Sequence, residues 1–347
     1  MSSYIDTMEL ESALASAETQ KTALPEPLSD KAVSSRADAV VFQGEKQLDI
    51  QQLTLIEPGT DDLAVDVHWS GVSTGTERLL WSSDMPPFPG LSYPLVPGYE
   101  AVGVVTDAQT HSDWIGKAVF VPGCHCFKEA TGVFGGSASK LIVPAERSVL
   151  LGDTAGVEDV LLALAATAHH AIKVAEPPEL IVGHGVLGRL LARITIALGH
   201  TPPTVWEINP ERKGREDYPV IAPQSDMRTD YASAYDVSGS VGVIDDIIAH
   251  SGKGATIVLA GFYSDRPSFA FPAAFMREVT LKIAAEWTPD DVSAVLALRK
   301  TGQLSFDNLV THSCQPADAA SAYDTAFGDP RCLKMVLDWR GSHDNAH

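Results

Sequence analysis

The sequence lacks an apolar run of the ~18 residues that a helix needs to cross a bilayer, and we therefore expect no membrane span. The longest candidate, VLLALAATAHHAI at residues 160–172, carries two histidines and is better interpreted as a buried helix. Basic residues are also scarce, since 25 Lys and Arg stand against 45 Asp and Glu, which gives a formal net charge of −20. Nucleic-acid binders need a basic surface to displace counterions from phosphate, so this charge favours a small-molecule partner.

Cysteine is rare as well, and its spacing excludes two common roles. The four cysteines show neither paired C-x-x-C spacing nor a secretory context, so we expect a reducing cytoplasmic compartment. Cys124 and Cys126 are separated by one residue, whereas tetrahedral zinc sites prefer at least two intervening residues. We interpret these two as small buried residues.

Large apolar residues are sparse in residues 1–36, which lack the basic start and apolar centre of a signal peptide and are predicted to form a flexible tail. The remaining length favours two domains. Between Asp38 and Pro144, short Val- and Ile-rich runs are separated by Gly and Pro, which predicts a β-barrel or a strongly bent sheet. From Glu158 onward, helical and strand-like segments alternate, which indicates βαβ units and a parallel sheet.

The most informative stretch is IVGHGVLGRLLARITIALG, residues 181–199. Its glycines form G-x-G-x-x-G after an apolar strand and before an amphipathic helix, the context in which this pattern predicts a dinucleotide-binding turn. The first glycine permits the tight turn, the second lets a pyrophosphate approach the helix N-terminus, and the third lets helix and strand pack closely. The predicted cofactor contacts in this turn are Gly183, His184, Gly185, Val186, Leu187 and Gly188.

An acidic residue lies at the end of the next apolar strand, TVWEI, at the spacing that a dinucleotide fold requires. Glu207 lies about 20 residues beyond the glycines, where a carboxylate accepts hydrogen bonds from the adenosine ribose hydroxyls. The same carboxylate repels a 2′-phosphate. The sequence therefore predicts NAD rather than NADP as the cofactor.

The order of these segments resembles the medium-chain dehydrogenase/reductase superfamily over nearly all of the chain after the tail. The motifs are PGYEAVGVV at 97–105, ATAHHAI at 166–172, the glycine turn and the C-terminal segment 302–327. The resemblance implies an α/β plus β fold. Its parts are a GroES-like β-barrel catalytic domain, residues 37–160 and 288–341, and a Rossmann NAD-binding domain with a doubly wound parallel sheet, residues 161–287. It is also compatible with a homodimer.

Three longer runs resemble a narrower group within this superfamily, the dehydrogenases of bacteriochlorophyll biosynthesis. They are WSGVSTGTERLLWS at 69–82, MPPFPGLSYPLVPGYE at 85–100 and CLKMVLDWR at 332–340. The resemblance implies NAD-dependent oxidation of the 3-(1-hydroxyethyl) group of a chlorin or bacteriochlorin to 3-acetyl. A zinc-free NAD(P)H-dependent quinone or enoyl reductase, and a catalytically silent cofactor-binding protein, stay open as alternatives because they would share the fold.

Zinc-dependent members of the superfamily carry metal ligands where this chain has Ser73, Tyr99 and, approximately, Ala163. A catalytic zinc with three protein ligands cannot be built from these side chains, so we expect a metal-free enzyme. A positioned general base then has to handle the hydroxyl proton, at a typical contribution of ~10²–10⁴-fold. Tyr99 is the first candidate, unless it only fills the vacated volume as a packed aromatic ring. Ser73, Thr76 and His169 are the others, each with a structural role as its alternative.

A flat macrocycle requires an open apolar site with a few polar anchors. The proline-rich segment LLWSSDMPPFPGLSYP supplies Trp81, Phe88 and Tyr93 as candidate substrate contacts, although such a segment also serves to cover the edge of a barrel. His125 is a further candidate, since imidazole is a common axial ligand of the magnesium in a chlorin.

Overall fold

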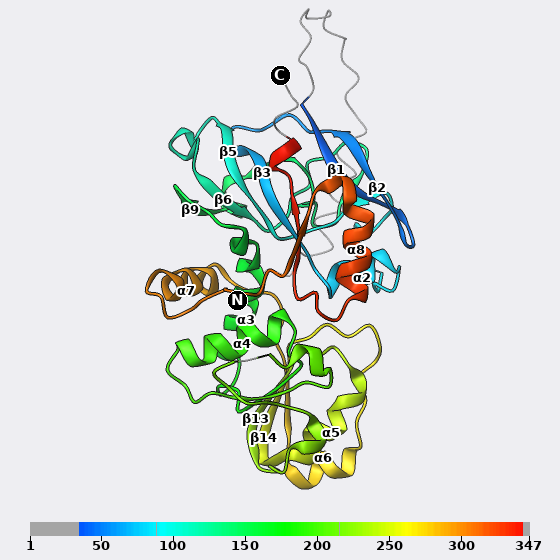
Figure 1. Cartoon of the computed structure of the whole chain (residues 1–347), viewed down its shortest axis with the longest axis vertical. Helices are drawn as coiled ribbons and strands as arrows, with labels where there is room; N and C mark the ends of the chain where they lie inside the picture. The colour runs from blue at the N-terminus through cyan, green and yellow to red at the C-terminus, as the bar shows by residue number, and fades with distance from the viewer. Residues whose placement is uncertain (1–34, 88, 215, 343–347) are drawn as a thin grey trace, which may run out of the picture. The chain divides into compact units, whose positions relative to one another are not determined.

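The computed structural model describes residues 35–87, 89–214 and 216–342 (Figure 1). The flexible tail predicted for residues 1–36 lies outside this range except for its last two residues, of which Arg36 already begins the first strand. Within the described part, none of the helices combines the length and the apolar character needed to cross a bilayer.

Two sheets contain the strands of the N-terminal half, and the larger sheet also includes β16 and β17 from the C-terminal end of the chain. The strand orders are β2-β1-β4-β7 and β16-β17-β3-β5-β6-β9, and β8 pairs with β3. The smaller sheet consists of β1 (Arg36–Gly44), β2 (Gln47–Thr54), β4 (Leu95–Val96) and β7 (Thr131–Gly132). The larger consists of β3 (Asp62–Val72), β5 (Ala101–Ala108), β6 (Ala118–Val121), β8 (Lys140–Pro144), β9 (Val149–Gly152), β16 (His312–Cys314) and β17 (Met335–Asp338). The predicted β-rich segment is confirmed.

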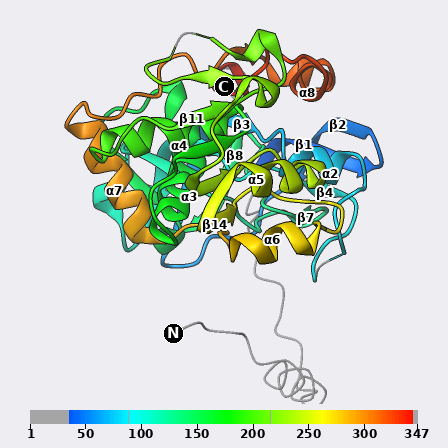
Figure 2. The same cartoon turned by 90° about the horizontal axis from the view of Figure 1, so that it is seen from below.

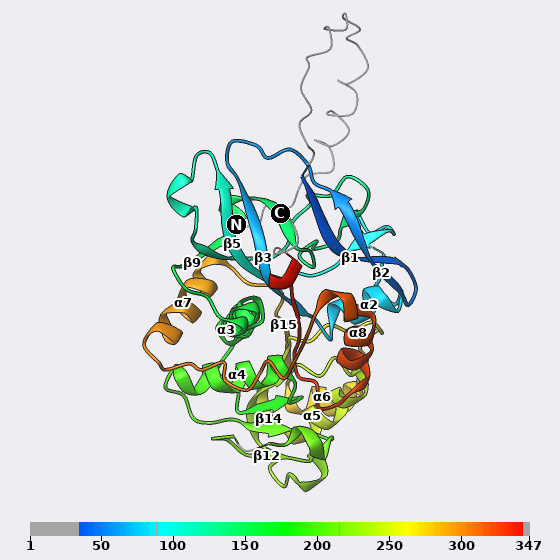
Figure 3. The ribbon, with the colours of Figure 1, turned by 45° about the horizontal axis from the view of Figure 1, so that its top comes forward.

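The C-terminal end of the chain returns to these strands. Strand β17 pairs antiparallel with β3, so that Met335 lies opposite Val72. Helix α8 (Ala319–Gly328) lies beside helix α2 (Thr76–Trp81), as Figures 1 and 3 show, and the rings of Trp81 and Phe327 are 5.4 Å apart. This return brings side chains that are more than 200 positions apart next to one another.

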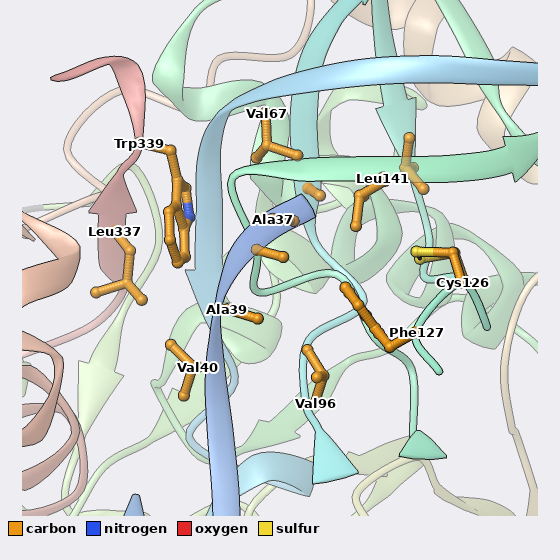
Figure 4. Close-up of a cluster of buried hydrophobic side chains, with 14 of the residues drawn as sticks. Ala37, Ala39, Val40, Val67, Val96, Cys126, Phe127, Leu141, Leu337 and Trp339 are labelled. Atoms are coloured by element: carbon orange, nitrogen blue, oxygen red, sulfur yellow. Dashed lines mark hydrogen bonds between the residues drawn. The ribbon is translucent and has the colours of Figure 1, made fainter. Parts of the chain in front are cut away.

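The apolar core of this half follows from the alternation of side chains along its strands. In β3, Leu63, Val65 and Val67 are fully buried, and the intervening residues are more exposed. Figure 4 shows the cluster that they join, which includes residues of β1 and, from just after β17, Trp339. The indole of Trp339 donates a hydrogen bond of 2.9 Å to Ser70 Oγ, which satisfies its only polar group in the core.

The six-stranded sheet is entirely parallel and has the order β12-β11-β10-β13-β14-β15. Counted from its own first strand the order is 3-2-1-4-5-6, the doubly wound arrangement whose topological switch point lies between β10 and β13. Its strands are β10 (Leu180–Val182), β11 (Thr204–Trp206), β12 (Val220–Ile221), β13 (Tyr231–Asp236), β14 (Ser251–Leu259) and β15 (Thr280–Ile283). The predicted Rossmann sheet is confirmed.

Helices cover both faces of this sheet. Ile181 of β10 packs with α3 (Leu162–Lys173) and α4 (Val186–Ala197). Its neighbours on the strand, Leu180 and Val182, join the cluster of α5 (Ile244–His250) and α6 (Phe271–Arg277), the two helices that lie beside β14 in Figure 2. Residues 162–172 of the apolar run thus lie in a mostly buried helix, as predicted, and residues 160–161 end the 3-10 turn before it.

The remaining elements are helix α7 (Pro289–Lys300), which packs on α3, and several 3-10 turns. The turns are Ser112–Trp114, Ala145–Arg147, Val157–Leu161, Pro210–Arg212, Pro223–Ser225, Val241–Val243, Pro316–Asp318 and Arg340–Ser342. The domain limits at 160/161 and 287/288 stay predictions.

Candidate active site

The turn between β10 and α4 has a backbone that requires glycine. Gly183 has a φ of +103°, in the region that side chains rarely adopt. A Cβ on Gly188 would lie 1.9 Å from the Gly183 carbonyl oxygen, so this glycine lets the helix pack against the turn. At Gly185, the N-cap of α4, an added Cβ would meet no atom within 4 Å. This open space beside a helix N-terminus fits the pyrophosphate of a dinucleotide.

Glu207 is fixed beside this turn, directly after β11. One carboxylate oxygen accepts the His184 backbone N–H at 3.2 Å and the other accepts the Asn209 backbone N–H at 2.7 Å. The next residue, Ile208, is 79 % exposed. Ile208 was assigned no role in the sequence analysis, although an apolar residue directly after the predicted ribose-binding acid was the available signal. Acid and apolar side chain both lie at the carboxyl end of the sheet, where such folds bind ligands.

The ring of His184 is directed into the protein. Its Nδ1 donates to the Arg212 carbonyl at 2.7 Å and its Nε2 accepts from the Tyr218 hydroxyl at 2.9 Å. Burial, together with the charge of Arg189, lowers the pKa of His184 to about 4, so the imidazole is neutral near pH 7. The ring therefore holds the segment after β11 against the turn. A contact of His184 with the cofactor would come from its backbone, while Val186 and Leu187 begin α4.

The structure brings Tyr99 together with two of the other predicted catalytic residues. Tyr99 lies between β4 and β5 and is partly exposed, and its hydroxyl is 2.7 Å from Ser73 Oγ. The Thr76 side chain lies near the same phenol and lowers its pKa. Phe134 packs edge to face on the Tyr99 ring, with the ring centroids 5.4 Å apart. The Tyr99 hydroxyl is therefore hydrogen-bonded to Ser73 on a side chain that is partly exposed.

Burial and neighbouring charges keep Tyr99 protonated. Burial and the carboxylates of Glu100 and Glu77 raise its pKa, and the hydrogen bonds to Ser73 and Thr76 offset this only in part. A free phenolate is therefore unfavourable near neutral pH. Tyr99 is suited to accept one proton while it passes its own to a neighbouring hydroxyl.

Glu100 forms a buried ion pair that sequence reasoning missed. The Lys334 ammonium is 2.6 and 2.9 Å from the two Glu100 oxygens and 3.3 Å from the Val72 carbonyl. Burial raises the pKa of Glu100, and Lys334 opposes this shift. An added Cβ on Gly71 would lie 2.2 Å from Glu100 Oε2, so glycine is needed there. A lysine inside the otherwise apolar segment CLKMVLDW was the available signal.

The residues at the zinc-ligand positions do not fit a catalytic zinc. The hydroxyls of Ser73 and Tyr99 bond to each other, and Ala163 is a buried alanine of α3 without a donor atom. Among residues 35–87, 89–214 and 216–342, no three His, Cys, Asp or Glu side chains form a group that could hold a metal ion. Three-ligand zinc chemistry therefore has no site built for it here.

His169 is held by a buried aspartate at the start of α7. Its Nδ1 is 2.8 Å from one oxygen of Asp291, whose other oxygen is 3.0 Å from Nδ1 of His170. Burial would raise the pKa of Asp291, but hydrogen bonds from Thr288 and His169, and then Lys173, hold it well below its usual range. The two adjacent histidines thus both bind this carboxylate. A catalytic role of His169 stays a prediction.

The predicted substrate contacts are partly occupied by other interactions. Trp81 and Tyr93 both pack against the N-terminal core, and the Tyr93 hydroxyl donates to the Leu80 carbonyl. His125 is exposed on the loop after β6, between the buried Cys124 and Cys126. Phe88 lies outside the described residues. These contacts stay predictions, and the two cysteines are buried as expected.

Comparison with known proteins agrees with this geometry. Residues 59–153 match the alcohol dehydrogenase GroES-like domain. Over 306 residues the chain is 51 % identical to the 2-desacetyl-2-hydroxyethyl bacteriochlorophyllide A dehydrogenase of Rhodobacter capsulatus, a match that covers 87 % of this chain and 98 % of that protein.

Two solved structures share the fold. A short chain alcohol dehydrogenase of Escherichia coli CFT073, complexed with NADH, matches 88 % of this chain and 99 % of its own with a TM-score of 0.75 and 18 % identity. A putative zinc-binding dehydrogenase of Sinorhizobium meliloti 1021, bound to NADP, matches 88 % and 99 % with a TM-score of 0.73 and 16 % identity. The fold thus accommodates either nicotinamide dinucleotide.

Proposed function

The chain belongs to the family of 2-desacetyl-2-hydroxyethyl bacteriochlorophyllide A dehydrogenases, and we propose that it oxidises the 3-(1-hydroxyethyl) group of a chlorophyllide or bacteriochlorophyllide to 3-acetyl. The observation that carries this proposal is 51 % identity over 98 % of the relative. It is tested by the absorbance spectrum of the purified protein with NAD and a hydroxyethyl chlorin, because acetylation at that position shifts the long-wavelength band. An unchanged spectrum, with ready reduction of quinones by NADPH, would support a reductase instead.

The cofactor is a nicotinamide dinucleotide, and we propose NAD. The space at Gly185 takes the pyrophosphate, and Glu207 keeps lone pairs for the ribose hydroxyls beyond the two backbone bonds that fix it. The exposed side chain of Ile208 supplies an apolar surface for the adenine. When bound, the cofactor accepts the hydride that leaves the substrate carbon.

We propose that Tyr99 handles the hydroxyl proton. The carbon loses a hydride with both electrons of the C–H bond, and the hydroxyl oxygen loses its proton to the Tyr99 oxygen. Tyr99 simultaneously passes its own proton to the partly exposed Thr76, whose hydroxyl releases its own proton to water, while Ser73 holds the Tyr99 oxygen by its hydrogen bond. Zinc normally stabilises the oxygen in this step. Here the conjugated macrocycle delocalises positive charge on the reacting carbon, which lessens that need.

The macrocycle has to lie close to Tyr99, because the reacting carbon is attached directly to the ring system. Phe134, in edge-on contact with Tyr99, is the aromatic side chain that we add to the predicted contacts Trp81, Tyr93 and His125. Phe134 has a φ of +69°, which is uncommon for a bulky residue and is typical of constrained functional loops.

We further propose a homodimer in a reducing cytoplasmic compartment. Strand β15 ends the six-stranded sheet, and Phe271, Phe275 and Met276 beside it are 66, 64 and 72 % exposed. They line a cavity of about 440 Å³. Two copies related by a two-fold axis would pair their edge strands antiparallel and cover both apolar surfaces. The chain's net charge of −20 disfavours the anionic surface of a membrane as the alternative partner.

A further inference from the structure

Glu77 is a completely buried carboxylate that forms no ion pair of its own with any residue of the described part of the chain. It is the second residue of α2, and it accepts the Ser73 backbone N–H at 3.1 Å and the Tyr323 hydroxyl at 2.7 Å. The nearby Lys334 ammonium is bound to Glu100 instead. Burying a charge without an ion-pair partner costs free energy of folding, which suggests a functional reason for keeping Glu77.

Ser73 connects this carboxylate to the proposed catalytic tyrosine. Its backbone N–H binds Glu77, and its hydroxyl binds Tyr99. Tyr323 reaches Glu77 from α8, which lies beside α2 in Figure 3. The charged and titratable groups that act on Glu77 are thus Tyr323 of α8, Glu100 before β5 and Lys334 before β17. Glu77 in turn acts on Tyr99.

The electrostatics of this arrangement give Glu77 two protonation states near neutral pH. Burial raises the pKa of Glu77 to about 7, although the hydrogen bonds from Tyr323 and the Ser73 backbone lower it. When Glu77 is ionised, its negative charge raises the pKa of Tyr99. The same negative charge stabilises the positive charge of the proton that passes through the hydroxyl pair when an alcohol is oxidised.

Building on the proposed proton relay, we propose that Glu77 is a positioning residue for the oxidation. The ionised carboxylate holds Ser73 through its backbone and strengthens the Tyr99–Ser73 hydroxyl pair as a proton acceptor. Oxidation therefore proceeds from the enzyme in which Glu77 is ionised. Reduction of the ketone, in which the same pair must donate a proton, is favoured by the enzyme in which Glu77 is protonated.

The test is the pH dependence of kcat for oxidation of a hydroxyethyl chlorin at saturating NAD. In the natural protein kcat rises with pH through about 7, the pKa of Glu77. Glu77→Gln keeps an acceptor for the Ser73 N–H but has no charge to titrate, so this rise disappears and kcat falls roughly 10-fold or more. Tyr323→Phe removes a hydrogen bond to the ionised carboxylate, so the rise moves roughly one unit to higher pH.

A matched control is Tyr231→Phe, which removes a hydroxyl that donates to Asp226 at 2.8 Å in the six-stranded sheet. This variant should keep the natural profile. If folded Glu77→Gln keeps the same rise near pH 7, or Tyr323→Phe leaves it in place, the inference is wrong. The Tyr323→Phe profile decides the question if Glu77→Gln does not fold. If the natural protein does not oxidise the chlorin, both the proposed function and this inference are wrong. If the natural protein is active but the variant profiles are unshifted, only this inference is wrong.

Discussion

The Tyr99 hydroxyl and Ser73 Oγ lie 2.7 Å apart, so one hydrogen bond joins two positions at which the resemblance to zinc-dependent dehydrogenases predicts metal ligands. Both groups are neutral donors and acceptors, which suits the transfer of a proton and not the binding of a divalent cation. The carboxylates of Glu77 and Glu100 lie nearby, and Glu100 forms an ion pair with Lys334. The arrangement therefore favours proton release from an alcohol.

The first prediction concerns the choice of cofactor. Glu207→Ala should weaken NAD binding by on the order of 1–3 kcal/mol, because the hydrogen bonds from the ribose to the carboxylate are lost. It should also relieve the repulsion of NADP, because the negative charge near the 2′-phosphate is removed. The measurement is the Kd of both cofactors by titration calorimetry. Glu211→Ala is the control, since Glu211 lies on the same segment and is exposed. If the natural and Glu207→Ala proteins prefer NAD over NADP to the same extent, Glu207 does not bind the ribose.

The buried ion pair gives a prediction about stability. Lys334→Met should lower the free energy of unfolding by about 3–5 kcal/mol, because it leaves the buried Glu100 charge unpaired. Adding Glu100→Gln should recover much of this loss. Urea unfolding at pH 8 measures both variants. Lys117→Met, which breaks the exposed pair with Asp153, should leave the free energy of unfolding almost unchanged because solvent screens this pair. A similarly small effect of Lys334→Met would contradict the importance of the buried pair.

The sequence predicted the local features of the site better than its long-range ones. The glycine turn and Glu207 could be predicted from patterns within 25 residues, because a strand, a turn and a helix that are consecutive in the chain restrict one another's conformation directly. Lys334 and Glu100 are 234 positions apart, and their meeting depends on the pairing of β17 with β3. Asp291 forms a capping box with Thr288 at the start of α7, but its bonds to two histidines depend on how α7 packs on α3.

The proposed homodimer is tested at its apolar surface. Met276→Glu places a charge among Phe271, Phe275 and the β15 edge, so it should convert a dimer into a monomer without loss of fold. Light scattering after size-exclusion chromatography measures the mass. Met227→Glu is the control, because Met227 is 89 % exposed and lies outside this surface. A natural protein of monomeric mass, or a Met276→Glu protein that stays dimeric, would contradict the proposal.

In the proposed mechanism, Tyr99 replaces the metal in the oxidation of a hydroxyethyl chlorin. The decisive experiment measures the single-turnover rate of Tyr99→Phe and of the natural protein, with NAD and hydroxyethyl chlorin, after treatment with a strong chelator. The natural protein should keep its rate without metal, and Tyr99→Phe should keep its NAD affinity but react roughly 10²-fold more slowly, since only the hydroxyl is removed. A natural protein that loses its rate to the chelator and regains it with zinc, or a Tyr99→Phe protein with the full rate, would show that Tyr99 does not replace a metal.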